Sequence, residues 1–249
     1  MQHVYTQGMV LRHPKVIGVV LGRMDSSRLP GKLMREVNGL PLIEYVLRRA
    51  AAIRGIEQVV LATSDRPVDE PLYQYAREHG FAAYRGPLDN VTHRAVTCAE
   101  MFGADYFLRI NGDSPWLDSR LAMSALPYCD GQTDLVTNLI GRTFPYGIAV
   151  EIVRTAALRR KLPTLLPEER EHVTSHIYSN LRDFLVHDMR SPRIELATTR
   201  LTVDSEADLR NFETCVRALG DGTWSADYIT TAQTYLEHCP NDQLVLHPA

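Results

Sequence analysis

A short loop after the first apolar run of the sequence gathers cationic and hydroxyl side chains. The loop follows Val16–Leu21 and reads Arg-Met-Asp-Ser-Ser-Arg-Leu-Pro-Gly-Lys. Its candidate side chains are Arg23, Ser27, Arg28 and Lys32. Guanidinium groups offer paired donors and an ammonium group offers a mobile charge, so this loop could hold a polyphosphate. A solvated basic loop explains the spacing equally well. Neither a Walker A loop nor a GxGxxG fingerprint occurs in the chain.

Two aspartates follow apolar runs that are far apart in the chain. Asp113 lies in Gly-Asp-Ser-Pro, and Asp204 ends the run Leu-Thr-Val-Asp. Mg²⁺ takes one or two carboxylates together with substrate phosphates, so this pair could hold the ion at one sheet edge. The alternatives are structural. Gly-Asp-Ser-Pro is ordinary turn chemistry, and Asp204 or Ser205 could cap the helix that follows.

Three further side chains are candidates for contacting a second, anionic substrate. Arg109 lies just before the Gly-Asp-Ser-Pro turn, and Arg170 and His172 lie in the run Glu-Arg-Glu-His. A buried arginine paired with a structural carboxylate, or a solvated helix start, would explain them as well. His172 and His176 have a spacing that can bind zinc on a helix, but no HExxH pattern and no third ligand accompany them.

Short apolar runs alternate with amphipathic segments along the first half of the chain, which predicts βαβ units, an α/β fold and a mostly parallel sheet. Ligands of such sheets bind at the carboxyl ends of the strands. The expected strands are 16–21, 33–37, 58–63, 82–85, 106–110, 134–137, 148–153 and 198–203. The expected helices are 41–53, 69–79, 91–102, 168–180, 206–219 and 228–238.

Length and composition indicate a globular protein in a single domain of 249 residues, with 1–14 as a leader and about 140–195 as an elaboration. The chain is 45% hydrophobic and 23% charged, which argues against disorder. A net charge of −3 argues against general nucleic-acid binding, and no apolar run is long enough to span a membrane. We expect a cytoplasmic protein with four free thiols, which more plausibly pack in the core than act as nucleophiles: Cys98, Cys129, Cys215 and Cys239.

Taken together, the motifs resemble the cytidylyltransferase family over roughly residues 15–215. The resemblance is carried by Arg-x-x-Ser-Ser-Arg-Leu-Pro-Gly-Lys, by Gly-Asp-Ser-Pro and by Leu-Thr-Val-Asp, with further likeness at 84–86, 89–94, 144–147 and 169–174. That family contains CMP-3-deoxy-manno-octulosonate synthetases, CMP-sialate synthetases and spore-coat polysaccharide cytidylyltransferase-like proteins. The last group looks closest.

The resemblance implies a three-layer, Rossmann-like nucleotidyltransferase fold that moves CMP from CTP to an anionic acceptor and releases pyrophosphate. It further implies a homodimer that pairs near 140–180. The implied roles are triphosphate binding by Arg23, Ser27, Arg28 and Lys32, base and ribose contacts by Thr63, Ser64 and Arg94, and Mg²⁺ binding by Asp113 and Asp204. The residues expected to be catalytic are Arg23, Lys32, Asp113 and Asp204. The expected acceptor contacts are Arg109, Tyr146, Glu151, Arg170 and His172.

The sequence departs from the relatives in a run that reads Pro-Asp-Gly-x-Asp-Val-Glu in the spore-coat type. Tyr146 and Ala149 stand where those relatives have acids, and His93 replaces another acid. Losing two carboxylates would remove repulsion toward an anion, which favours a phosphonate slightly over a 2-keto sugar acid. The alternatives are a guanylyl- or uridylyltransferase acting on a sugar 1-phosphate, and a non-catalytic nucleotide-binding protein. The presence of Lys32 together with both aspartates argues against the second alternative.

Overall fold

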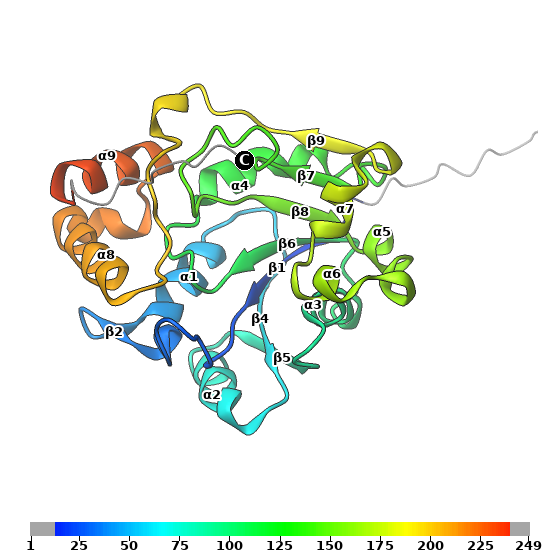
Figure 1. The fold of residues 1–249 in the computed structure, drawn as a ribbon, viewed down its shortest axis with the longest axis horizontal. Coiled ribbons are helices and arrows are strands. Elements are labelled where there is room, and N and C mark those ends of the chain that lie inside the picture. The colour runs from blue at the N-terminus through cyan, green and yellow to red at the C-terminus, as the bar shows by residue number, and fades with distance from the viewer. Residues whose placement is uncertain (1–12, 240–249) are drawn as a thin grey trace, which may run out of the picture.

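The computed structural model describes residues 13–239, which form a seven-stranded sheet around β1 (Val16–Leu21) (Figure 1). The strand order is β5-β4-β1-β6-β8-β7-β9, and β8 (Glu151–Arg154) runs antiparallel to both of its neighbours. The other strands of this sheet are β4 (Val59–Ser64), β5 (Ala82–Gly86), β6 (Tyr106–Asn111), β7 (Leu135–Thr137) and β9 (Val186–Asp188). The expected α/β fold with a mostly parallel sheet is confirmed.

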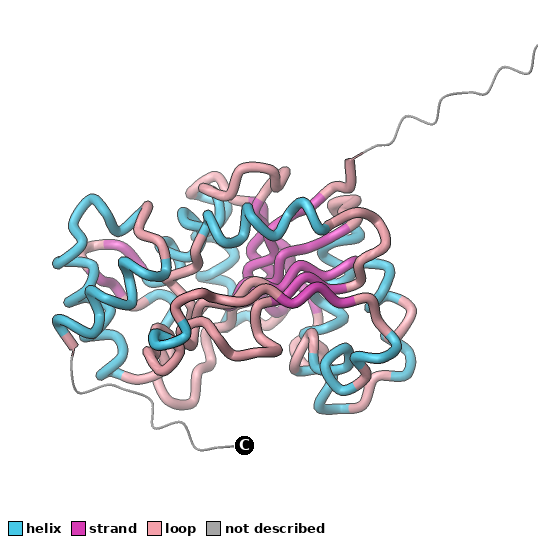
Figure 2. The backbone as a smooth tube through the Cα atoms, turned by 90° about the horizontal axis from the view of Figure 1, so that it is seen from above, coloured by secondary structure: helices cyan, strands magenta, loops and turns pink. Residues whose placement is uncertain are grey.

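Helices cover both faces of the sheet, which makes the three layers visible in Figure 2. Residues of β1 divide between the two cores, because Val16 and Val20 face one layer while Ile17 and Val19 face the other. The first layer contains α1 (Leu42–Ala51), α2 (Glu70–Glu78), α4 (Ser119–Ala125), α8 (Glu206–Leu219) and α9 (Tyr228–His238). The second layer contains α3 (Val91–Met101), α5 (Thr155–Arg159) and α7 (Ser175–Ser179).

The predicted strand at 33–37 is wrong in its first half. Lys32–Met34 forms a 3-10 turn, and only β2 (Glu36–Val37) is extended, pairing with β3 (Leu40–Pro41) across the Asn38-Gly39 turn. The predicted strand at 148–153 starts later, at Glu151. Before that residue, the Asn138 side chain bonds the backbone in place of a neighbouring strand. It donates to the Ile148 carbonyl and accepts from the Val150 amide.

The predicted helix at 168–180 is two short helices, α6 (Pro167–Glu171) and α7, separated by residues 172–174, the first of which is extended. His172 has φ −109° and ψ 98°, and the nearby Thr174 hydroxyl bonds the Glu151 carboxylate. The predicted strand at 198–203 is also wrong. That segment forms one bridge, Tyr146 with Arg200, and otherwise bonds to loops. Helices α4 and α5 and strand β9 were not predicted.

No helix within residues 13–239 is long and apolar enough to cross a membrane. All four cysteines are buried and form no disulfide. Burial raises the pKa of the Cys98 thiol to about 12, so this side chain remains a neutral core residue.

Arg49 joins α1 to the carboxyl-terminal helices from a buried position. Its guanidinium donates to the backbone carbonyls of Leu117, Thr223 and Ala226. Burial lowers its pKa to about 10, so the side chain stays charged at neutral pH.

Replacing Arg49 by methionine should lower the free energy of unfolding by about 3 kcal/mol, because three buried carbonyls lose a charged donor. Urea denaturation measures this change. Arg217→Met is the matched control, since Arg217 is exposed and, among residues 13–239, forms an ion pair with Glu213 alone, on its own helix. The control should change the stability by less than about 0.5 kcal/mol. An equal loss of unfolding free energy in both variants would show that the contacts of Arg49 with the three carbonyls add little to stability.

Candidate active site

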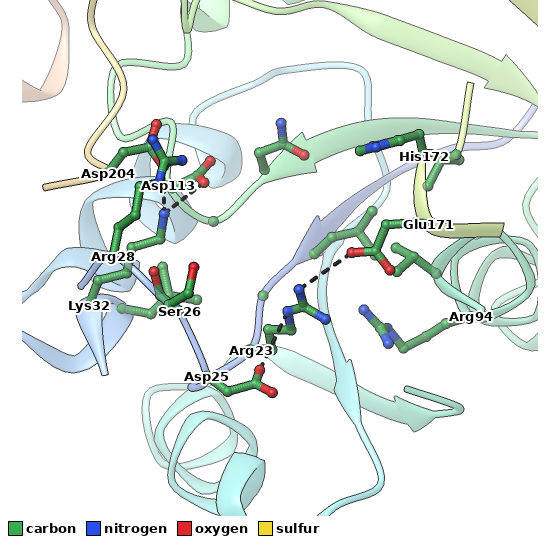
Figure 3. A pocket seen from close by; sticks show the side chains of 18 of the residues that line it. Arg23, Asp25, Ser26, Arg28, Lys32, Arg94, Asp113, Glu171, His172 and Asp204 are labelled. Carbon is green, nitrogen blue, oxygen red and sulfur yellow. Dashed lines mark hydrogen bonds and ion pairs between the residues drawn. The ribbon is translucent and has the colours of Figure 1, made fainter. Parts of the chain in front are cut away.

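Most of the predicted site residues line one cavity at the carboxyl ends of β1 and β6 (Figure 3). The cavity has a volume of about 410 Å³. The chain continues from β1 to β4 on one side and later adds β6 on the other side of β1, so the strand order reverses at β1. Open α/β sheets bind ligands at such a switch point. The predicted residues that line it are Arg23, Ser27, Arg28, Lys32, Arg94, Arg109, Asp113, His172 and Asp204.

Glycines allow the loops after β1 and β6 to approach each other closely. A Cβ atom on Gly22 would lie 2.6 Å from Leu33 Cδ1, and one on Gly112 would lie 3.1 Å from the Leu21 carbonyl oxygen. Gly31, with φ 67°, precedes the 3-10 turn, and a residue with a Cβ atom would be strained in that conformation. The basic loop is thereby folded back against the sheet edge.

Asp69 fixes the same loop from the side of β4. Its buried carboxylate accepts a 2.6 Å hydrogen bond from the Met24 backbone amide, and it also contacts the Ser64 hydroxyl and the Arg66 guanidinium. Arg66 in turn pairs with Asp25 on the loop at 2.6 Å. The loop is therefore tied to the sheet through both backbone and side chains.

The Lys32 ammonium lies between the two aspartates that were predicted to bind metal. Its Nζ is 2.9 Å from Asp113 Oδ2 and 3.0 Å from Asp204 Oδ1, and it donates to the Val203 carbonyl at 3.1 Å. Lys32 and Asp204 are buried, while 30% of the Asp113 side chain is exposed. The structure thus brings together Asp113 and Asp204, which are far apart in the sequence, at one point of the cavity.

Asp204 is surrounded by positive charge. Arg28 Nη2 lies 2.9 Å from its Oδ1 atom, and Arg200 Nη2 lies 2.7 Å from its Oδ2 atom. Burial acts to raise the pKa of this carboxyl, but the hydrogen bond from Lys32 and the charges of Lys32, Arg28 and Arg200 lower it below its usual value. Asp204 is therefore a carboxylate at neutral pH.

Arg23 and Arg94 lie on the opposite side of the cavity (Figure 3). Arg23 is 3.4 Å from both Asp25 and Glu171, and these contacts join the loop after β1 to the end of α6. The Arg23 side chain is 41% exposed, so it can reach a ligand in the cavity.

Arg94 is the most buried of the arginines that line the cavity, with 2% exposure. It donates to the Pro87 carbonyl at 2.8 Å, but its Nε has no partner, and no carboxylate within residues 13–239 lies in ion-pair distance. Burial, followed by the charge of Arg23, lowers its pKa. A buried guanidinium without an anionic partner is suited to binding a polar or anionic ligand group.

Arg109 lines the cavity from β6 and is held from behind by Glu151. Glu151 is fully buried, and it pairs with the Arg109 guanidinium and accepts hydrogen bonds from Thr174 at 2.6 Å and Tyr178 at 2.9 Å. Glu151 does not line the cavity, so its predicted role as a contact residue is not supported. It positions Arg109 instead.

Four other predicted contact residues lie outside the cavity lining. Thr63 is fully buried, and Ser64 is buried against Asp69. Arg170 is exposed on α6, and Tyr146 is 47% exposed with its ring 5.5 Å from the Arg200 guanidinium carbon. None of these four side chains lines the cavity, so their predicted contacts with the base, the ribose and the acceptor remain predictions.

The zinc alternative at His172 and His176 is also not supported. The break between α6 and α7 separates the two histidines, and His176 Nδ1 lies 2.9 Å from Glu169 Oε1. Within the part of the chain that the structure describes, no group of three or more His, Cys, Asp or Glu side chains could hold a metal ion.

Asp113 and Asp204 fit Mg²⁺ as partial ligands. Carboxylate oxygens are the hard donors that this ion prefers, and Mg²⁺ commonly takes one or two of them together with phosphate oxygens of a substrate. Both carboxylates contact the same cation, Lys32. Two carboxylates leave coordination positions that substrate phosphates could fill.

Sequence reasoning missed several polar residues that line the cavity: Asp25, Ser26, Asn111 and Glu171. Asn111 ends β6 two residues before Asp113, so its place after a buried strand was an available signal. Glu171 belongs to the same Glu-Arg-Glu-His run as the predicted His172. The helix break at His172 brings this pair, and not Arg170, to the cavity.

Comparison with known proteins decides the family. The cytidylyltransferase profile matches residues 17–204. The chain belongs to the cytidylyltransferase family. It is therefore a nucleotidyltransferase, and the family supports CTP as the nucleotide in place of UTP or GTP.

Relatives and solved structures agree with this cytidylyltransferase assignment. The spore coat polysaccharide biosynthesis protein SpsF of Bacillus subtilis is 26% identical over 83% of this chain and 88% of its own length. A 3-deoxy-manno-octulosonate cytidylyltransferase of Acidobacterium capsulatum is 36% identical over 41% of each chain. A cytidylyltransferase structure from Leptospira borgpetersenii is 25% identical, covers 94% of this chain and all of its own, and has a TM-score of 0.86.

A structure of CMP:2-keto-3-deoxy-manno-octonic acid synthetase complexed with CTP shares the fold. Its TM-score is 0.62 at 21% identity, over 82% of this cytidylyltransferase and 99% of that chain. The expected Rossmann-like nucleotidyltransferase fold is thus confirmed.

Proposed function

We propose that this cytidylyltransferase moves CMP from CTP to a small anionic acceptor in a Mg²⁺-dependent reaction that releases pyrophosphate. The observation that carries this proposal is the convergence of Arg23, Arg28 and Lys32 with two carboxylates in one cavity. An acceptor oxygen attacks the α-phosphorus, and the bond from that phosphorus to the bridging oxygen breaks. The bonding electrons leave with pyrophosphate.

The residues divide into three roles along the cavity. Arg23, Ser27, Arg28 and Lys32 bind the triphosphate, and the buried Arg94 contacts the base or ribose. Asp113 and Asp204 hold Mg²⁺, which when bound neutralises charge on the phosphate oxygens. The protein needs positioned cations and no covalent nucleophile, because the reaction develops negative charge on oxygens.

Arg109 supports an anionic acceptor. Its guanidinium faces the cavity from the end of β6, and His172 lines the cavity from the segment after α6. A phosphonate or carboxylate oxygen is already ionised at neutral pH, so its attack requires no general base, whereas a sugar hydroxyl acceptor would require activation, for example by a metal. The proposed acceptor is a phosphonate in preference to a 2-keto sugar acid. This preference rests on the sequence alone, because Tyr146 and Ala149 stand where relatives have acids but neither residue lines the cavity.

Replacing Ala149 by aspartate tests the acceptor assignment. Ala149 is half-buried just before β8. A new carboxylate there should raise the acceptor KM by about tenfold through repulsion, with the CTP KM unchanged. Ala149→Asn is the matched control and should have a smaller effect. An unchanged acceptor KM in Ala149→Asp would count against an acceptor near this segment.

Mass spectrometry tests the reaction and names the acceptor class. Purified enzyme is incubated with Mg²⁺, all four nucleoside triphosphates and a pool of phosphonates, 2-keto sugar acids and sugar 1-phosphates. We expect a CMP adduct of a phosphonate or sugar acid. An adduct of a sugar 1-phosphate would overturn the acceptor assignment, and a GMP or UMP adduct would overturn the choice of base.

A further inference from the structure

The Lys32 ammonium occupies the position where the two carboxylates converge. Its three polar neighbours, Asp113, Asp204 and the Val203 carbonyl, all lie within 3.1 Å of Nζ. The side chain is only 10% exposed, so water contributes little to its solvation. The same two carboxylates are the proposed ligands of Mg²⁺, so Lys32 and the metal compete for them.

The charges around this point oppose a divalent cation. Asp204 Oδ1 contacts Lys32 and Arg28, and Oδ2 contacts Arg200 and the Thr202 hydroxyl. Both of its oxygens are therefore already engaged. Arg200 also lies 4.0 Å from Asp208, so three cationic side chains face three carboxylates and the group is already neutral without a metal. Mg²⁺ loses its hydration water reluctantly and would gain little here.

A triphosphate reverses this balance. It brings several negative charges and many acceptor oxygens into the cavity beside Arg28 and Lys32, which are both cavity-lining. Arg28 is 65% exposed and can change partners at low cost. An ammonium on a four-carbon stem can likewise move toward phosphate. Each contact transferred from carboxylate to phosphate frees a carboxylate oxygen.

We propose that Lys32 closes the divalent-cation site of the free enzyme, and that the triphosphate opens it by drawing Lys32 and Arg28 onto phosphate oxygens. The inference rests on the proposed function for its assignment of Asp113 and Asp204 to the metal. It adds that metal and nucleotide bind with positive coupling. Because coupling is reciprocal, the metal must raise nucleotide affinity by the same factor.

The test measures binding of Mn²⁺, as a paramagnetic substitute for Mg²⁺, by electron paramagnetic resonance without turnover. The full-length enzyme is titrated alone and with a non-hydrolysable CTP analogue. The analogue should increase Mn²⁺ affinity by about 100-fold, near the upper end of typical couplings. Calorimetry should find the same increase in analogue affinity when Mn²⁺ is added. Equal Mn²⁺ affinity with and without the analogue would overturn the inference.

A variant isolates the role of Lys32. Lys32→Met keeps most of the side-chain volume and should bind Mn²⁺ without nucleotide at least about tenfold more tightly than the wild type, because the competing cation is gone. Lys161→Met, at a lysine outside the cavity, should match the wild type. Adding Asp113→Asn to Lys32→Met should remove the gained binding. Unchanged Mn²⁺ affinity in a folded Lys32→Met protein would contradict the inference.

Failure of the metal assignment can be distinguished from failure of the role given to Lys32. If Asp113→Asn and Asp204→Asn bind Mn²⁺ with the analogue as well as the wild type does, the metal assignment of the proposed function is wrong. If those variants lose Mn²⁺ binding but the wild type binds Mn²⁺ equally with and without the analogue, only the role of Lys32 is wrong. The wild-type titrations do not depend on any variant folding.

Discussion

Asp113→Asn and Asp204→Asn should each lower kcat for CMP transfer by about 10³-fold, the largest effect expected in this enzyme. The two carboxylates converge on one point of the cavity, and the proposed function assigns both of them to the metal. Asparagine keeps the shape of the side chain but removes the charge. Steady-state kinetics at saturating CTP, Mg²⁺ and acceptor measure the loss.

The double variant separates a shared role from two independent roles. Residues that act as a unit give non-additive losses, so Asp113→Asn combined with Asp204→Asn should be little slower than either single variant. Asp221→Asn, on the exposed 3-10 turn after α8, is the control and should keep wild-type kcat. Activity that survives the double change would refute the metal assignment.

Arg109→Met should raise the acceptor KM by about 100-fold while the CTP KM changes by less than about threefold. Arg109 faces the cavity from β6, and its loss removes the cation proposed to bind the acceptor anion. The same change also leaves the fully buried Glu151 without its ion-pair partner. A loss of stability is therefore expected in addition to the kinetic effect.

Variants at Glu151 separate the two effects. Arg109→Met combined with Glu151→Gln removes the unpaired charge, so the melting temperature should recover while the acceptor KM stays high. Glu151→Gln alone keeps the Thr174 and Tyr178 contacts possible and should raise the acceptor KM by a smaller factor. If CTP and acceptor KM rise together in Arg109→Met, the residue contacts the nucleotide and the acceptor assignment fails.

The sequence predicted the first four strands of the sheet and the convergence of Asp113 with Asp204, because local signals marked them. Alternating apolar and amphipathic segments located β1, β4, β5 and β6 to within a residue or two. Asp113 lies two residues after the end of β6, so recognising that strand was enough to place it at the sheet edge. Asp204 was placed correctly for a partly wrong reason, since the segment before it is an extended loop and not a strand.

The direction of individual side chains could not be predicted, because it depends on contacts between distant segments. Glu151 belongs to a run that was expected to contact the acceptor, yet its contacts with Arg109 and Thr174 hold it in the interior. The same Thr174 contact accompanies the break in the helix predicted at 168–180, and the break presents His172 to the cavity. The periodicity of the segment 168–180 could not reveal this break, because the partner of Thr174 is Glu151, which lies on β8.

One labelling experiment tests the central claim most directly. The enzyme is incubated with Mg²⁺, an excess of the acceptor and CTP carrying radioactive phosphorus at either the α or the γ position. The account predicts that α label appears only in the acceptor adduct and γ label only in pyrophosphate, with one pyrophosphate per adduct. Transfer of γ label to the acceptor, or release of CMP without an adduct, would contradict it.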